Sequence, residues 1–139
     1  IPKPLVDPST SELATDLLWA DPMIGCKGTR PNQVRGVSIH FGENALDEFL
    51  TRLGLKMVVR GHQMMMNGFN FFHEKKLITI FTAASYYPDK PNHGAVMYFD
   101  DVGRIGFKIL VPKSDGVKIF RGEHDEANEK DIGFVQSAD

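Results

Sequence analysis

The spacing of apolar and polar positions predicts two helices in the first part of the chain. A short helix is expected after a cap at Ser9 or Thr10, with one apolar stripe formed by Leu13, Leu17 and Leu18. The clearest helix is expected over residues 43–53, whose apolar face consists of Leu46, Phe49, Leu50 and Leu53. Gly54 follows at a position where glycine commonly ends a helix.

The remaining apolar runs are short and predict strands. Residues 56–60 form one compact run, whereas 23–34 show no periodicity and predict a loop. Four further strands are expected over 69–72, 77–82, 94–99 and 104–111. Together these elements predict an α/β (α+β) fold over 1–112, followed by a charged, disordered tail over 113–139.

Composition excludes several classes of protein. The net charge is −2 and no basic stripe is visible, so the sequence does not favour a nucleic-acid partner. No apolar stretch approaches the roughly 20 residues that a membrane-spanning helix needs, so no membrane association is expected. A single cysteine, Cys26, excludes an internal disulfide framework and suits a reducing, intracellular compartment. Cytoplasm and nucleus both fit this expectation.

Three residues stand out as candidates for chemistry, each with a structural alternative. His62 comes just after the strand expected over 56–60, where an imidazole can bind a metal, act as a base or simply form a structural hydrogen bond. Arg35 could bind a phosphate through two hydrogen bonds or form a surface ion pair. Tyr86 lies in a loop whose aromatic residues suit either binding or packing. His40, His93 and a few carboxylates are further candidates.

Five motifs, taken in order, narrow these alternatives. They are DLLWADP at 16–22, RGVS at 35–38, VRGHQ at 59–63, LITIFTA at 77–83 and GAVM at 94–97. This series resembles the C-terminal half of the serine/threonine phosphoprotein phosphatases, which belong to the calcineurin-like metallophosphoesterases. Residues 69–72 and the following strand look closest to the type-1 branch. The resemblance implies a central β-sandwich flanked by helices.

The resemblance also implies a site and an activity. Members of the family hydrolyse phosphoserine and phosphothreonine on proteins with two divalent metal ions, for which Mn, Fe and Zn are the candidates. By position in the motifs, His62 matches a metal ligand and Arg35 matches a residue that binds the phosphate oxygens. Tyr86 matches a tyrosine at the edge of the substrate site. Phosphoproteins are the implied substrates.

Several family motifs do not occur in these 139 residues. They are Gly-Asp-x-His-Gly, Gly-Asp-x-Val-Asp-Arg-Gly and Gly-Asn-His-Glu, which carry most of the metal ligands. At most one ligand, His62, is present, and one imidazole does not hold two metals. We therefore expect a fragment of a longer phosphatase that is inactive by itself. The alternative is a catalytically inactive remnant that binds partners.

Two further comparisons with the family pattern concern recognition. Thr82-Ala83-Ala84-Ser85-Tyr86-Tyr87 replaces the usual Ser-Ala-Pro-Asn-Tyr-Cys, which changes the loop at the substrate edge. The type-1 branch also binds regulatory subunits through an apolar peptide that adds a strand to a sheet edge. The positions that match this docking groove are Met57, Phe71, Ile78, Ile80, Met97, Ile105 and Phe107. These positions suit core strands equally well.

Overall fold

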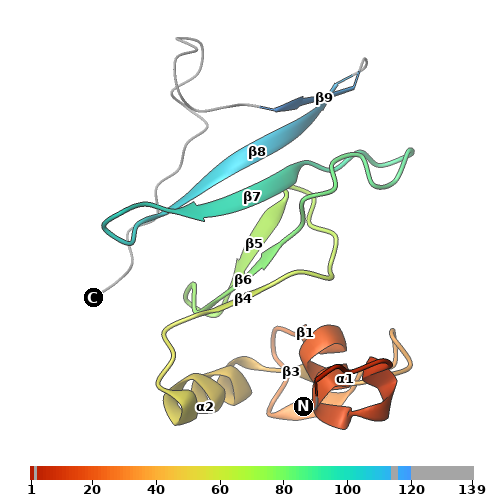
Figure 1. The fold of residues 1–139 in the computed structure, drawn as a ribbon, viewed down its shortest axis with the longest axis vertical. Helices are drawn as coiled ribbons and strands as arrows, with labels where there is room; N and C mark the ends of the chain where they lie inside the picture. The colour runs from red at the N-terminus through yellow and green to blue at the C-terminus, as the bar shows by residue number, and fades with distance from the viewer. Residues whose placement is uncertain (2, 114–115, 120–139) are drawn as a thin grey trace. The chain divides into compact units, whose positions relative to one another are not determined.

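The chain forms two compact units, and a computed structural model describes residues 1, 3–113 and 116–119 of it (Figure 1). The first unit comprises Ile1–Val58 together with Phe71–Ile78. The second comprises Val59–Asn70 together with the described residues from Thr79 onward. The mixed α/β (α+β) class is confirmed.

Two short helical elements open the first unit. A 3-10 turn, η1 (Pro8–Thr10), is capped by Asp7, and helix α1 (Glu12–Trp19) is capped by Ser11, whose Oγ accepts a hydrogen bond from the Ala14 N–H at 3.3 Å. The expected cap at Ser9 or Thr10 is therefore wrong, because those residues belong to η1. The apolar stripe of α1 is not packed within the described structure. Its leucines are exposed, and only Ala14 is buried.

Helix α2 (Glu43–Leu53) confirms the clearest sequence prediction and supplies the core of the first unit. Leu46 and Leu50 are buried together with Leu77, and Phe41, Val58 and Phe72 pack against this cluster. Gly54 ends the helix in the left-handed conformation, as its type and position predicted. Burying such side chains is worth about 1.5–3 kcal/mol each.

A small sheet carries the loops that lead to Arg35. Its strand order is β1 (Asp21–Pro22), β3 (Ile39–Phe41) and β2 (Thr29–Pro31). β1 is parallel to β3, and β2 is antiparallel to it. The expectation of a loop throughout 23–34 is wrong at β2, because pairing with β3 orders a segment that has no periodicity of its own.

Two further three-stranded sheets follow. One has the order β4 (Val58–Arg60), β6 (Leu77–Ile80) and β5 (Phe69–Phe72), and its strands contribute residues to both units. The other, drawn in teal to blue in Figure 1, is antiparallel in the order β7 (Gly94–Phe99), β8 (Ile105–Lys113) and β9 (Gly116–Ile119). In the second unit, the rings of Phe69 and Phe107 stack with centroids 4.1 Å apart.

Strand β9 corrects the expected start of the tail. β8 extends through Lys113 and pairs with Gly116–Ile119, so a strand occupies part of the segment that was expected to be disordered. The alternation in Gly116-Val117-Lys118-Ile119 is the short pattern that the charged surroundings obscured. The expectation for 120–139 lies outside the described residues. Within the described part of the chain, no helix has the length and apolar character needed to cross a membrane.

Candidate functional site

In the first unit, Arg35 is held in an ion pair with a buried aspartate. The Arg35 Nε donates to Asp21 Oδ2 at 3.0 Å. The Asp21 side chain is 4% exposed and that of Arg35 is 28% exposed. Arg35 therefore forms an ion pair, as one of its two alternatives predicted, but the partner is a buried carboxylate rather than a surface one. Such a pair fixes the direction of the guanidinium while part of it remains accessible to solvent.

A buried asparagine organises the loop that carries Arg35. Asn32 is 2% exposed, and its side chain donates to Asp21 Oδ2 at 3.0 Å and accepts from the Arg35 backbone N–H at 3.1 Å. Its backbone N–H donates to the Ser38 carbonyl, and its own carbonyl accepts from the Gly36 N–H. Sequence reasoning missed both Asp21 and Asn32 as site residues. Asparagine three residues before an arginine in a glycine-containing loop was the available signal.

The other two histidine candidates are less exposed than His62. His40 lies on β3 opposite Asp21, and it is buried with no hydrogen-bond partner at Nδ1. His93 is half-buried, and its backbone N–H donates to the Met66 carbonyl at 2.9 Å.

In the second unit, His62 lies in a tight turn just after β4. Its φ of 76° places it in the left-handed region, which costs a residue other than glycine roughly 1–3 kcal/mol. Arg60 braces the turn, because its Nη1 donates to Gln63 Oε1 at 2.6 Å and to Thr79 Oγ1 at 3.2 Å. Thr79 belongs to β6 and is buried. The imidazole of His62 is thus presented on an exposed turn anchored to the neighbouring strand.

The Tyr86 loop leaves the same end of these strands as the His62 turn. Arg60 of β4 lies beside Thr79 of β6, and a Cβ on Gly61 would lie 3.6 Å from the Ile80 carbonyl oxygen. Residues 61–63 therefore leave the sheet beside the chain that continues from β6 into the Tyr86 loop. Carboxyl ends of adjacent strands are common positions for functional side chains in α/β folds.

Backbone hydrogen bonds connect the residues that follow the His62 turn to both ends of the Tyr86 loop. The Phe81 N–H donates to the Gly68 carbonyl at 2.8 Å, and the Met66 carbonyl accepts from the N–H of His93. Gly68 has φ 80°, and a Cβ there would approach the Gly94 carbonyl carbon to 2.5 Å, so only glycine allows this approach. The second unit thereby brings His62 and Tyr86 to one end of a sheet. Arg35 belongs to the first unit.

Among the described residues, the available donors do not fit a complete dinuclear metal centre. Among residues 1, 3–113 and 116–119, no three or more His, Cys, Asp and Glu side chains form a group that could hold a metal ion. Each metal in such a centre needs several ligands. Among the candidate residues, His62 alone is a ligand type at the shared end of β4 and β6.

Comparison with known proteins indicates which family this chain resembles. The model of the calcineurin-like phosphoesterases matches residues 2–66, a span that includes both Arg35 and His62. A solved serine/threonine phosphatase from Saccharomyces cerevisiae, described as similar to human phosphatase PP5, matches with a TM-score of 0.53 and 27% identity. The chain is therefore similar to the calcineurin-like phosphoesterases over 65 of its 139 residues. The motif-based identification is therefore confirmed at the level of the family.

The structural match covers 91% of this chain but only 34% of the yeast protein. The chain thus spans about a third of the length of the phosphatase that it matches. Tyr86 falls outside the residues matched by the family model, although His62 and Arg35 fall inside them.

The expected docking positions differ in exposure. Ile78, Ile105 and Phe107 are buried, with exposed fractions of 0%, 6% and 4%. The half-buried positions are Met57, Phe71, Ile80 and Met97. The buried three belong to the core. Docking of a regulatory subunit stays a prediction.

Proposed function

We propose that this chain is part of a metal-dependent phosphatase that hydrolyses phosphoserine and phosphothreonine on proteins. The observation that carries the proposal is the calcineurin-like family match over 2–66, which contains the motif arginine and the motif histidine together. The similarity to a yeast serine/threonine phosphatase supports this choice of substrate class.

Arg35 is proposed to bind the phosphate oxygens. A guanidinium is planar, always charged and able to donate two parallel hydrogen bonds to a phosphate. The Arg35 Nε is already engaged by the carboxylate of Asp21, which is itself held by Asn32. An arginine oriented before the substrate arrives loses less conformational freedom on binding than a mobile one.

His62 is proposed to contribute one ligand, and Tyr86 to border the substrate. Two divalent cations (Mn, Fe or Zn), when bound, supply the charge that neutralises the phosphate and activates a water. The described residues do not supply enough donors for them, so we propose that the other ligands come from the family motifs that these 139 residues lack. The chain alone is then expected to be inactive.

Activity measurements test this function. The full-length gene product is assayed on a phosphoserine peptide with added Mn²⁺, then again after removal of metal with a chelator. Activity should require the metal, and Arg35→Lys should lower kcat/KM by about 100-fold because a lysine cannot reproduce the oriented fork. Arg52→Lys, on the exposed surface of α2, is the matched control and should retain activity. Metal-independent hydrolysis, or no hydrolysis at all, would contradict the proposal.

A further inference from the structure

Two adjacent tyrosines project from the loop between β6 and β7. Tyr86 and Tyr87 are 55% and 52% exposed. The Tyr86 ring meets the ring of Phe81 edge-on at 5.2 Å between centroids, and Tyr87 meets Tyr86 in the same way at 4.9 Å. Interplanar angles of 83° and 85° are typical of favourable edge-to-face pairs. The three rings form a ladder that runs from the end of β6 into solvent.

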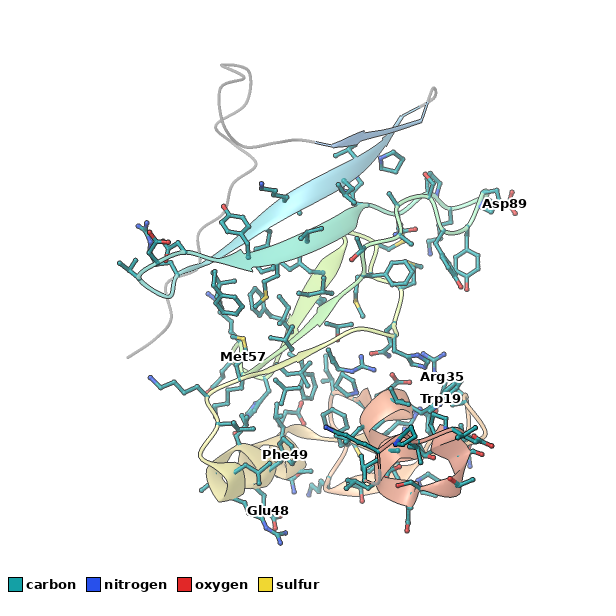
Figure 2. All side chains as sticks on the ribbon, in the orientation of Figure 1. Trp19, Arg35, Glu48, Phe49, Met57 and Asp89 are labelled. Carbon is teal, nitrogen blue, oxygen red and sulfur yellow. The ribbon has the colours of Figure 1, made fainter. Side chains whose placement is uncertain are left out.

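The backbone of the loop that carries these rings is held by a hub, which here means a buried asparagine that forms hydrogen bonds with several residues of its loop. Asn92 is completely buried, and its side chain donates to the carbonyls of Ala83 and His93 at 2.9 and 2.7 Å. Its Oδ1 accepts from the Tyr86 N–H at 2.9 Å, and its carbonyl accepts from the Ser85 N–H. The tyrosines are therefore presented from a fixed backbone. Figure 2 shows Asp89 farther out, at the tip of the loop.

Exposed aromatic rings on a fixed backbone suit recognition. Burial of a large aromatic side chain on binding gains much apolar contact, and a fixed ring loses little conformational entropy in doing so. Because the loop tip carries one acidic and one basic residue, Asp89 and Lys90, local charge does not select a strongly charged peptide. The chemistry instead favours an apolar or aromatic side chain.

We propose that Tyr86 and Tyr87 form an aromatic platform that binds a large apolar or aromatic side chain flanking the phosphorylated residue of a protein substrate. The placement supports this occupant, because the loop leaves the sheet beside the His62 turn, and Phe81 and His93 at its two ends bond to Gly68 and Met66, which follow that turn in the chain. This inference rests on the proposed function. Within it, Tyr87 acts as a specificity-determining residue.

Paired peptides test the platform in the full-length gene product. Two phosphoserine peptides are compared that differ only in a flanking residue, Phe in one and Ser in the other. The wild type should use the Phe peptide about 10-fold more efficiently, which corresponds to about 1.4 kcal/mol. Tyr87→Ser should reduce this ratio to near 1, mainly through KM, whereas Tyr87→Phe should retain it. Phe99→Ser, a change at a 63% exposed aromatic on β7, is the matched control and should leave the ratio intact.

Equilibrium binding separates this inference from the proposed function. The same two peptides, with a non-hydrolysable phosphonate in place of the phosphate, are titrated into the wild type and Tyr87→Ser. A Phe preference in binding that Tyr87→Ser abolishes supports the platform even if neither phosphopeptide is hydrolysed, an outcome that would refute only the proposed function. Equal binding of both peptides by the wild type, or a preference that survives Tyr87→Ser, would overturn the platform and leave phosphatase activity unaffected.

Discussion

The two loops that carry the candidate residues are built around the same device, a buried asparagine. Asn32, at 2% exposure, organises the Arg35 loop of the first unit, and Asn92, at 0%, organises the Tyr86 loop of the second. In each loop the side-chain carbonyl accepts from the backbone N–H of the candidate residue. Both asparagines also accept a backbone N–H at their own carbonyl.

The two hubs differ in where their amide groups donate. Asn32 donates to the carboxylate of Asp21, which also pairs with Arg35, so that loop directs a charged side chain through a buried ion pair. Asn92 donates only to main-chain carbonyls and leaves the tyrosine rings outside. The Asn32 hub includes a charged carboxylate and therefore orients the side chain of Arg35. The Asn92 hub bonds only to backbone groups, so it fixes the backbone and leaves the tyrosine side chains available to a partner.

Removing the first hub should have the largest effect on stability. Asn32→Ala leaves the Arg35 N–H without its partner and takes one hydrogen bond from the buried carboxylate of Asp21. Each buried polar group left unsatisfied costs about 1–3 kcal/mol, so the free energy of unfolding should fall by roughly 3 kcal/mol. Urea denaturation measures this change. The neighbouring exposed residue gives the control, Gln33→Ala, and equal stability of the two variants would contradict the account.

Removing the second hub should have a smaller global effect and a clear local one. Asn92→Ala removes three neutral hydrogen bonds, at about 0.5–1.5 kcal/mol each. Because the groups left behind are uncharged and this loop can relax towards solvent, the net loss should stay below that of Asn32→Ala. Amide hydrogen exchange at Tyr86 should accelerate, while exchange at Arg35 stays as in the wild type. Asn70→Ala, an exposed position on β5, should change neither. If Tyr86 keeps its protection in Asn92→Ala, the loop is held by something other than this hub.

A third interaction, a partly exposed ion pair between α2 and the turn that joins β5 and β6, should contribute the least to stability. Asp47 of α2 accepts from Lys76 Nζ at 2.7 Å and lies 2.8 Å from His73 Nε2, on the turn between β5 and β6. The Lys76 hydrogen bond, followed by that of His73, lowers the pKa of Asp47 below its ordinary value of 3.8. The stability it contributes is therefore present above that value and is lost as the pH falls through the lowered pKa.

Asp47→Asn should accordingly lower the thermal unfolding midpoint slightly at pH 7 and not at all below the lowered pKa. The neighbouring exposed Glu48, labelled on α2 in Figure 2, provides Glu48→Gln as the control, which should have no effect at either pH. A difference between Asp47→Asn and the wild type that persists in strong acid would show that the carboxylate charge is not the cause.

The sequence predicted regular elements well where apolar spacing is local. Helix α2 and strands β5 and β7 occur at the expected residues, because their patterns are set within a single element. Strands β1 and β2 were not foreseen, because they exist through pairing with β3 rather than through any alternation of their own. Helix α1 shows another limit of sequence-based prediction. Its helical spacing identified an apolar face but not what packs against that face, and in the structure these leucines are exposed.

The candidate site was predictable only in part. Motif resemblance identified Arg35, His62 and Tyr86, but not the side chains that hold them. Asn32 and Asn92 look like ordinary loop residues in sequence, and their burial depends on how distant backbone segments converge. The brace from Arg60 to Thr79 likewise joins two strands that are separated in the chain.

The most direct test of the central claim is the effect of His62→Ala on metal-dependent phosphatase activity. The full-length gene product and the variant are assayed on a phosphoserine peptide with Mn²⁺, and His93→Ala in the same unit is the matched control. Loss of a group supporting a metal ligand typically costs 10–100-fold, so loss of a ligand itself should lower activity by at least about 100-fold. The account predicts that loss in His62→Ala and near-normal activity in His93→Ala. Undiminished activity in a folded His62→Ala variant would contradict it.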